Sequence, residues 1–266
     1  MPADPYAASG SRWALGAELV YRPIAAALVA TSPHSLAGRT VLDAGAGTGA
    51  ASAALRPRAA EVLAVDLSPA MLAWHASARR RCAVADIRAL PLAAASVDDA
   101  VAAFVLNHLP DPAAGLSELV RVTRPGGAVL AAVFANESRS AARDRVDAAA
   151  RAAGWQAPDW YTEMKATTAP ILGTADTMAA AARAAGLANV HAEEGQVDVG
   201  VTEPAQLVRY RFGHPAFAAW LDAIGAGRAA TAAAQAENAV GDSMVPYRPR
   251  VVFLRAVTRP VAAAQY

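Results

Sequence analysis

Short apolar runs alternate with helical patterns through the first half of the chain. The runs predict strands over 40–43, 61–66, 82–86, 99–104 and 128–134. Between them, apolar residues recur at helical spacing and predict helices over 17–30, 50–59, 68–81 and 111–123. Strands that alternate with helices at this spacing favour an α/β fold, in which helices cover both faces of a parallel sheet.

The second half of the chain follows a different pattern. A charged helical stretch opens at residue 138 and leads into an aromatic segment over 155–164. A helix over 174–187, ended by Gly186, precedes a predicted sixth strand over 188–201. A helical insert over 203–240 then separates that strand from a seventh, over 250–258. We therefore expect additions to the core that are mainly helical.

Three glycines follow the first predicted strand, in the stretch DAGAGTGA over 43–50. A phosphate-binding P-loop would end in Gly-Lys-Ser/Thr, and no lysine follows these glycines. The dinucleotide fingerprint G-x-G-x-x-G is matched imperfectly, because Gly45, Gly47 and Gly49 are followed by Ala50. From the loop sequence alone, the alternative is a tight strand-to-helix turn that binds no ligand.

Acidic residues close the first three predicted strands. Asp43, Asp66 and Asp86 would meet at the edge of the sheet where open α/β folds bind ligands. Asp66 follows the first glycine by about 20 residues, the spacing of an acid that accepts hydrogen bonds from both ribose hydroxyls. Asp43 would repel a pyrophosphate but suits an ammonium or sulfonium cation. Together, these three acidic residues favour S-adenosylmethionine over NAD as the ligand of this site.

The ordered motifs resemble those of the class I S-adenosylmethionine-dependent methyltransferases, in particular the small-molecule enzymes of the ubiquinone/menaquinone and natural-product subgroup. VLDAGAGTG resembles their first motif and VLAVDLSPAMLAWHA their second. AVADIRALPLAAASVDDAVAAFVLNHLPD resembles the third and fourth, and ELVRVTRPGGAVLAAVF the next helix and strand. The resemblance implies a Rossmann-like sheet of seven mostly parallel strands in the order 3-2-1-4-5-7-6, with an antiparallel last strand and helical lid inserts.

The same resemblance implies a cofactor site. The loop residues that would lie against the methionine portion are Asp43, Ala44, Gly45, Gly47 and Gly49. Asp66 would hold the ribose, while Leu67, Asp86 and Ile87 would contact the adenine. Phe104 and Asn107 would close the site under the sulfonium, and Arg12 or Tyr21 would meet the methionine carboxylate.

The resemblance also implies that residues 1–266 form one domain. An N-terminal helical lid over 1–37 precedes a cofactor-binding core over 38–135, and substrate-side inserts occupy 138–170 and 203–246. The aromatic and histidine residues expected to contact a small aromatic or polyketide-like acceptor are Tyr6, Trp13, Trp155, Trp160, Tyr161, Tyr210 and His214. Ordinary helix packing is the alternative for each of them.

Methyl transfer from a sulfonium is a direct displacement, so the protein must chiefly align the acceptor and exclude water. His108, just after the fourth strand, is the candidate general base; a packing role before Pro110 is the alternative. We expect methylation of an O, C or N atom of a small organic molecule, in secondary metabolism. The alternatives are a non-methylating reaction such as a cyclisation, non-catalytic cofactor binding and, more distantly, an NAD-dependent oxidoreductase.

The composition of the chain restricts the kinds of partner that the protein is expected to bind. A net charge of +1 provides no general field for nucleic acid or an anionic membrane. The N-terminal stretch lacks the features of a signal peptide, and uninterrupted apolar runs fall short of membrane-spanning length. The single cysteine, Cys82, permits no internal disulfide, and no Cys/His spacing indicates a metal site. We expect a cytoplasmic monomer or homodimer without a metal.

Overall fold

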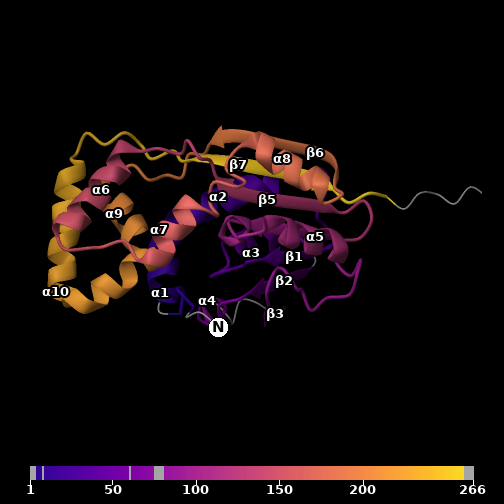
Figure 1. The fold of residues 1–266 in the computed structure, drawn as a ribbon, viewed down its shortest axis with the longest axis horizontal. Coiled ribbons are helices and arrows are strands. Elements are labelled where there is room, and N and C mark those ends of the chain that lie inside the picture. Colours follow the sequence, from indigo (N-terminus) through magenta and orange to yellow (C-terminus); the bar gives the residue numbers. More distant parts are fainter. Residues whose placement is uncertain (1–3, 8, 60, 75–80, 261–266) are drawn as a thin grey trace, which may run out of the picture.

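The computed structural model describes residues 4–7, 9–59, 61–74 and 81–260. A seven-stranded sheet in the order β3-β2-β1-β4-β5-β7-β6 forms its centre (Figure 1). The strands are β1 Thr40–Ala44, β2 Glu61–Asp66, β3 Arg81–Val84, β4 Asp99–Ala103, β5 Ala128–Phe134, β6 Ala188–Gln196 and β7 Arg250–Val257. Neighbours from β3 to β5 are parallel, and β7 is antiparallel to both β5 and β6. The predicted fold class and strand order are confirmed.

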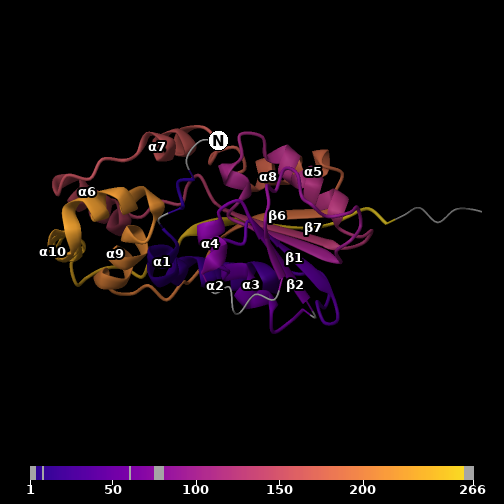
Figure 2. The same cartoon turned by 90° about the horizontal axis from the view of Figure 1, so that it is seen from below.

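Helices cover both faces of this sheet. α2 (Glu18–Ala30) and α3 (Ala50–Leu55) lie on one face, while α5 (Pro112–Val122) and α8 (Ala175–Ala184) lie on the other (Figure 2). Successive strand residues belong to opposite layers: Val41 packs with the α2 side and Leu42 with the α5 side. Because both sides of the central strands are buried, their sequences are continuously apolar rather than alternating.

Several helices and strands end earlier than predicted, each for a local reason. The helix that begins at Ala50 ends at Leu55, because Pro57 has no backbone N–H with which to continue the helical hydrogen bonds. α4 (Pro69–Ala73) starts with Ser68 as its N-cap, as predicted, but Trp74 is extended. The remainder of the helix expected over 68–81 falls largely at 75–80, outside the described residues. β4 ends at Ala103, since Phe104 has a φ of 61°.

The two outer strands also differ from their predicted ranges. β3 runs from Arg81 to Val84, so Asp86 follows the strand by two residues instead of closing it. β6 ends at Gln196 rather than 201, and a turn follows in which Gly200 N–H donates to the Asp198 carboxylate. Both strands lie at sheet edges, where partly exposed residues give a weaker apolar signal.

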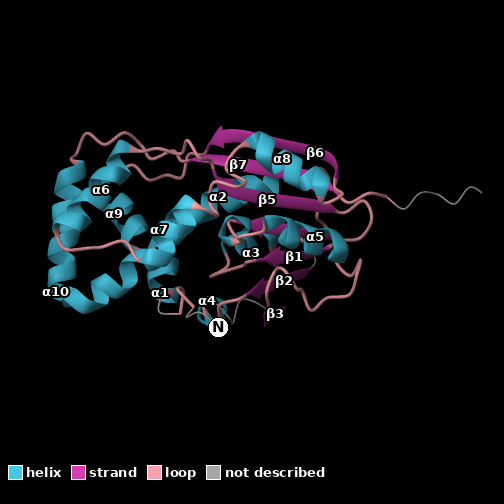
Figure 3. Ribbon diagram, in the orientation of Figure 1, coloured by secondary structure: helices cyan, strands magenta, loops and turns pink. Residues whose placement is uncertain are grey.

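Four added helices gather at one end of the sheet (Figure 3). They are α6 (Ala141–Ala152), α7 (Asp159–Ala166), α9 (Pro204–Phe212) and α10 (Pro215–Val240), which is kinked at Gly225. α6 follows β5, and α9 follows β6, which runs in the same direction as β5. These helices therefore lie beyond the carboxyl ends of the parallel strands.

The N-terminal segment reaches the same end of the molecule. α1 (Gly10–Arg12), a π-helix (Trp13–Ala17) and α2 form one continuous helix. Gly10–Ala30 would be long and apolar enough to cross a membrane by length and composition, but half of its apolar window is buried in protein. Gly16 is pressed against α9, because a Cβ there would lie 2.3 Å from the Arg209 carbonyl oxygen. Packing within the fold accounts for the apolar character of this helix.

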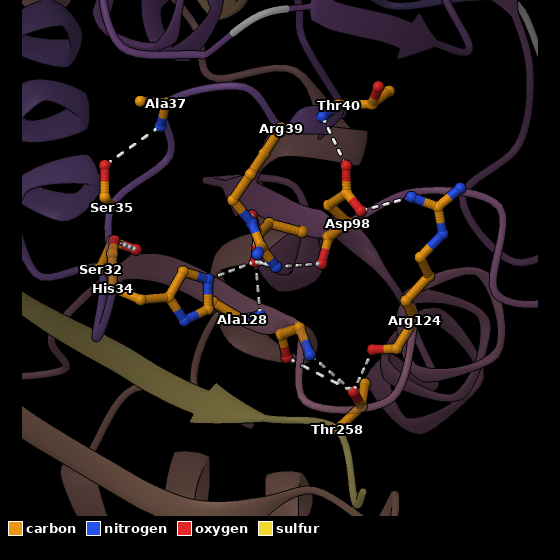
Figure 4. Close-up of polar contacts among 12 residues, drawn as sticks. Ser32, His34, Ser35, Ala37, Arg39, Thr40, Asp98, Arg124, Ala128 and Thr258 are labelled. Atoms are coloured by element: carbon orange, nitrogen blue, oxygen red, sulfur yellow. Dashed lines mark hydrogen bonds and ion pairs between the residues drawn. The ribbon is translucent and has the colours of Figure 1, made fainter. Parts of the chain in front are cut away.

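A polar network ties the opposite, amino ends of the strands together (Figure 4). Asp99 is buried and accepts hydrogen bonds from His34 Nε2 at 2.8 Å, Arg39 Nε at 2.5 Å and Ala128 N–H at 2.7 Å. It thereby joins the starts of β4 and β5 to the segment before β1. This network is structural and lies across the sheet from the glycine loop.

Candidate functional site

The glycine loop makes a tight turn that only glycine accommodates well. Gly45, Gly47 and Gly49 have φ angles of 70°, 52° and 106°, in the left-handed region. A Cβ at Gly45 would lie 2.3 Å from the Val105 Cβ, so the loop is also pressed against the end of β4. Ala46 N–H donates to the Val65 carbonyl at 2.9 Å and fixes the loop beside β2.

Asp66 closes this loop from the neighbouring strand end. Its carboxylate accepts from Gly47 N–H at 2.7 Å and from Ser68 N–H at 2.8 Å. A carboxylate offers about four acceptor positions, so Asp66 can accept hydrogen bonds from more than one donor at the same time. The half-buried position of Asp66 is compatible with the predicted ribose contact, which stays a prediction.

Two buried carboxylates lie against the glycine loop. Asp43 is 1% exposed and accepts from Ser52 Oγ at 2.5 Å. Glu18 of α2 is 2% exposed and accepts from the Thr48 hydroxyl and from Arg22. Buried carboxylates create a negative potential that suits a cationic ligand.

Sequence reasoning missed Glu18. The only available signal was an acid in a largely apolar helix, and nothing in the sequence showed that it would reach a loop thirty residues away. Its contact with Thr48 joins the N-terminal helix directly to the glycine loop.

The ends of β2 and β3 present open apolar surface. Leu67, just after β2, is 53% exposed, and Val84, at the end of β3, is 56% exposed. Ile87, three residues after Val84, is buried. Large exposed apolar side chains at strand ends suit the flat face of a base. Asp86, however, already binds Arg88, whose Nη2 lies 2.6 Å from its carboxylate. Hydrogen bonds from Arg88 lower the pKa of Asp86, so an adenine amino group would have to share this carboxylate with Arg88.

The end of β4 holds a strained residue and an unpaired amide oxygen. Phe104 adopts a left-handed backbone, which is costly for a bulky residue. Its ring packs against Tyr21 and Phe134, with centroid distances of 4.8 and 4.7 Å. Four residues beyond β4, in the 3-10 helix Leu106–His108, the Asn107 Oδ1 atom is buried without a hydrogen-bond partner among the described residues. Buried polar atoms in proteins rarely lack a hydrogen-bond partner, so this oxygen is a candidate acceptor for a hydrogen bond from a ligand or a water molecule.

His108 lies beside the N-terminal segment. Its Nε2 atom is 3.4 Å from the Tyr6 hydroxyl, and the two rings meet edge to face. Burial lowers the pKa of His108 to about 4. The imidazole is therefore neutral at pH 7 and is a weak base.

Aromatic side chains from five parts of the chain meet around His108. We call this group the aromatic cluster; it consists of Tyr6, Trp13, Tyr21, Phe104, Phe134, Trp160, Tyr210, His108 and His214. Trp13 lies 4.7 Å from Tyr21 and 5.3 Å from His214, measured between ring centroids. His214 has a buried Nε2 atom with no hydrogen-bond partner in the part of the chain that the structure describes. The cluster joins the lid, the ends of β4 and β5, α7 and the end of α9.

Two predicted site residues lie elsewhere, and their predicted roles remain predictions. Arg12 points to α10, where its guanidinium lies 2.5 Å from the Asp222 carboxylate. Trp155 stacks on Phe217 at 4.1 Å and donates its indole N–H to the Ala216 carbonyl. Tyr161 lies at the edge of the cluster, 5.7 Å from Trp160.

A groove of about 750 Å³ lies on the outer side of the lid. It is lined by Arg12, Leu15 and Gly16 and by residues of α9 and α10, and no member of the aromatic cluster contributes to it. Among the described residues, no group of three or more His, Cys, Asp or Glu side chains is arranged to hold a metal ion. The candidate site is therefore defined by the glycine loop and the aromatic cluster rather than by this groove.

Part of the chain is similar to known methyltransferases. Residues 42–131 match a family described as a methyltransferase domain. The chain is 41% identical to malonyl-[acyl-carrier protein] O-methyltransferase of Serratia marcescens over 100 residues, which are 37% of this chain and 39% of that protein. It is 42% identical to demethylmenaquinone methyltransferase of Beutenbergia cavernae over 101 residues, 36% of this chain and 41% of the relative. The chain thus matches only about two fifths of the length of these curated relatives.

Solved structures share the fold over much more of the chain. A putative methyltransferase of Haloferax volcanii, in complex with the Trm112 methyltransferase activator, covers 96% of both chains at 20% identity, with a TM-score of 0.58. The [4+2]-cyclase SpnF covers 90% of this chain and 81% of its own at 22% identity, with a TM-score of 0.55. Phosphoethanolamine N-methyltransferase 2 of Haemonchus contortus, in complex with phosphomonomethylethanolamine and S-adenosylhomocysteine, covers 89% of this chain and 52% of its own at 18% identity, with a TM-score of 0.57.

Proposed function

We propose that this chain, whose motifs and strand order are those of a class I methyltransferase, transfers a methyl group from S-adenosylmethionine to a small organic molecule. The observation that carries the proposal is the left-handed glycine loop at the end of β1, closed by the Asp66 carboxylate from the end of β2. In an open α/β sheet this is the edge at which nucleotides bind.

The residues present fit this cofactor. Asp43 provides buried negative charge beside the loop, where the amino group of the methionine portion would bind, and Glu18, which is paired with Arg22, lies against Thr48 of the same loop. Asp66 stands at the end of β2, where it would accept hydrogen bonds from the ribose hydroxyls, and Leu67 with Val84 offers apolar surface to the adenine. Asn107 supplies a buried amide oxygen at the end of β4. When bound, S-adenosylmethionine supplies a methyl group on a sulfonium, which needs no metal or electron donor.

The chain's own contribution to the reaction is alignment and exclusion of water. Positioning alone supplies on the order of 7–11 kcal/mol in well-oriented reactions. Trp13 and Tyr21 of the lid would cover the acceptor, and Trp160 and Tyr210 would line its other sides. His108 is neutral and would accept a hydrogen bond from an acceptor hydroxyl or amine; its low pKa makes it a poor match for removing a proton from an unactivated phenol. The attacking atom is O, C or N.

A second candidate is a reaction of this fold that transfers no methyl group. The [4+2]-cyclase among the structural neighbours has the same fold over 90% of this chain, and an aromatic cluster can also hold a folded polyene for cyclisation. The third alternative is a protein that binds the cofactor without catalysing a reaction. The domain layout expected from the sequence, a cytoplasmic location, a role in secondary metabolism and a monomeric or homodimeric state belong to the same proposal.

Mass spectrometry separates these functions. The protein is incubated with S-adenosylmethionine carrying a trideuterated methyl group and with a panel of hydroxylated, aminated and carboxylated aromatic compounds and of linear conjugated polyenes. Methyl transfer predicts a product heavier by one trideuteromethyl group and an equal amount of S-adenosylhomocysteine. Conversion of an acceptor without that mass gain supports a cyclase, and binding of S-adenosylhomocysteine without turnover across the panel supports the non-catalytic reading.

A further inference from the structure

The N-terminal segment is hydrogen-bonded to the end of β2. One carboxylate oxygen of Asp4 accepts from Ser68 Oγ at 2.6 Å, and the other accepts from Tyr6 N–H at 2.9 Å. Ser68 follows β2 by two residues, is 3% exposed, and donates its own N–H to Asp66 at 2.8 Å. A hydrogen bond to a carboxylate is stronger than one between neutral groups, so the contact of Asp4 with Ser68 is a firm attachment.

The same segment also reaches the end of β4. The Tyr6 ring meets the His108 ring edge to face at a centroid distance of 5.9 Å, and the Tyr6 hydroxyl lies 3.4 Å from His108 Nε2. On the β2 side, α1 lies beside α4 (Figures 1 and 2), and a Cβ at Gly10 would be 3.0 Å from the Ala70 carbonyl oxygen. We call residues 4–7, 9 and 10 the strap.

The strand order places the glycine loop between the two attachments of the strap. β1 lies between β2 and β4 in the sheet, and the glycine loop follows its carboxyl end. A segment that contacts both Ser68, after β2, and His108, after β4, must therefore pass the carboxyl end of β1. α4 touches the loop as well, since Met71 Cε is 3.5 Å from the Cβ position at Gly47. The strap thus crosses the edge of the sheet at which open α/β folds bind ligands.

The strap carries a buried hydroxyl group that the described residues leave without a partner. Ser9 is 1% exposed, and its Oγ atom has no hydrogen-bond partner in the described part of the chain. Asn107 Oδ1, next to His108 in the sequence, is in the same state. Buried polar atoms rarely lack a partner, so both atoms are candidate contacts of a polar molecule enclosed by the strap.

We propose that Asp4 and Ser68 are positioning residues that keep the strap across the glycine loop, so that the cofactor enters and its product leaves only when the hydrogen bond between them breaks. This inference rests on the proposed function, because it concerns exchange of S-adenosylmethionine and S-adenosylhomocysteine at that site. The hydrogen bond joins two protein groups, so it opposes entry and exit alike. It therefore controls the rates of exchange more than the affinity.

Surface plasmon resonance on the immobilised protein, with S-adenosylhomocysteine in solution, tests the proposal. Asp4→Ala should raise both the association and the dissociation rate constants by about tenfold, which corresponds to a barrier lower by about 1.4 kcal/mol. The dissociation constant should then stay within about threefold of the wild-type value. Loss of a residue that only contacts the cofactor would raise the dissociation rate and leave the association rate nearly unchanged.

Further variants identify the hydrogen bond itself as the cause. Ser68→Ala should give the same increases as Asp4→Ala, and the double variant should exchange no faster than either single variant, because both substitutions remove one and the same contact. Asp4→Asn keeps an oxygen that can accept from Ser68 and should exchange at rates between those of the wild type and Asp4→Ala.

Two control variants match the other roles of these side chains. Asp198→Ala removes a carboxylate that accepts from the N–H two residues on, as Asp4 does. Thr174→Ala removes the N-cap of α8, on the sheet face away from the lid, as Ser68→Ala removes the N-cap of α4. Both controls should bind and release S-adenosylhomocysteine at the wild-type rates.

Three results would overturn the inference and leave the proposed function intact. They are unchanged rate constants in Asp4→Ala and Ser68→Ala, faster dissociation without faster association, and increases that multiply in the double variant. A wild-type protein that binds no S-adenosylhomocysteine would overturn the proposed function, and the inference with it.

Discussion

His108 belongs to the aromatic cluster and is a weak base. Burial lowers its pKa to about 4, below the usual value of about 6.5, so the folded protein favours the neutral imidazole. The neutral form is fully present above about pH 5 and is lost as the pH falls through 4. We expect kcat/KM to show no inflection from His108 between about pH 6 and 9 and to fall on the acid side.

The pH profiles of the wild type and of His108→Gln measure this effect. Glutamine keeps a hydrogen-bonding group and does not titrate, so the acid limb should disappear in this variant. An inflection near pH 6.5–7 in the wild type that His108→Gln abolishes would show instead that His108 titrates as an ordinary base.

Asp99 should contribute to stability and not to ligand binding. Its buried carboxylate accepts hydrogen bonds from three residues at the amino ends of the strands, so Asp99→Asn removes the negative partner of Arg39, whose side chain is 31% exposed. We expect the free energy of unfolding to fall by about 2 kcal/mol. Denaturant titration measures this loss, and calorimetry should show unchanged affinity for S-adenosylhomocysteine. The exposed pair of Asp198 and Arg248 supplies the control, since Asp198→Asn should cost less than about 1 kcal/mol.

Asp98 makes part of the stability dependent on pH. Burial alone would raise its pKa, but hydrogen bonds from Thr40 N–H and Arg124 outweigh burial and lower it. A lowered folded-state pKa means that the stabilisation is present above the unfolded value of about 4 and is lost as the pH falls below it. Thermal unfolding of the wild type should thus lose stability below about pH 4 more steeply than Asp98→Asn. Parallel curves for the two proteins would contradict this assignment.

At the scale of elements, the contact between the lid and α9 depends on glycine. A Cβ at Gly16 would lie 2.3 Å from the Arg209 carbonyl oxygen and 3.1 Å from the Gly213 Cα, so Gly16→Ala must separate the two helices. Gly227 of α10 has open space around its Cβ position and serves as the control. Gly16→Ala should lower the melting temperature and speed tryptic cleavage near Arg12, whereas Gly227→Ala should be neutral or stabilising by up to about 1 kcal/mol. Equal protease sensitivity of the two variants would argue against a lid fixed by this contact.

The elements themselves could be predicted well from sequence where burial is complete. β1, β2, β5 and β7 were found to within one residue at each end, because strands covered on both faces are continuously apolar. The ends of the edge strands β3 and β6 were predicted too late in the chain, since their exposed residues carry little pattern. β4 was also found to within one residue, and its end at Ala103 differs from the prediction because the left-handed backbone of Phe104 depends on tertiary packing.

The candidate site could be predicted only where its residues lie on the core motif. The glycine loop and Asp66 follow from spacing along the chain. The contact of Glu18 with Thr48 and the pairing of Arg12 with Asp222 do not, because they join residues far apart in sequence through the packing of added helices. Even between near neighbours, the pairing of Asp86 with Arg88 was not anticipated.

At the scale of the whole molecule, the strand order found in known methyltransferase structures is combined with added helices at one end of the sheet. The family match covers residues 42–131, and the lid with α6, α7, α9 and α10 lies at the carboxyl ends of the strands (Figure 1). Under the proposed function, the core binds the methyl donor and the added helices contact the acceptor.

The central claim is tested most directly by calorimetric titration with S-adenosylhomocysteine of the wild type, Asp66→Ala, Asp66→Asn and the distant control Asp198→Ala. The wild type and the control should bind one equivalent with the same affinity, and Asp66→Ala should bind at least about tenfold more weakly, a loss of about 1.4 kcal/mol or more. Asp66→Asn, which retains an acceptor for one backbone N–H, should fold normally and bind with intermediate affinity. No binding by the wild type, or equal affinity in Asp66→Ala, would contradict the account.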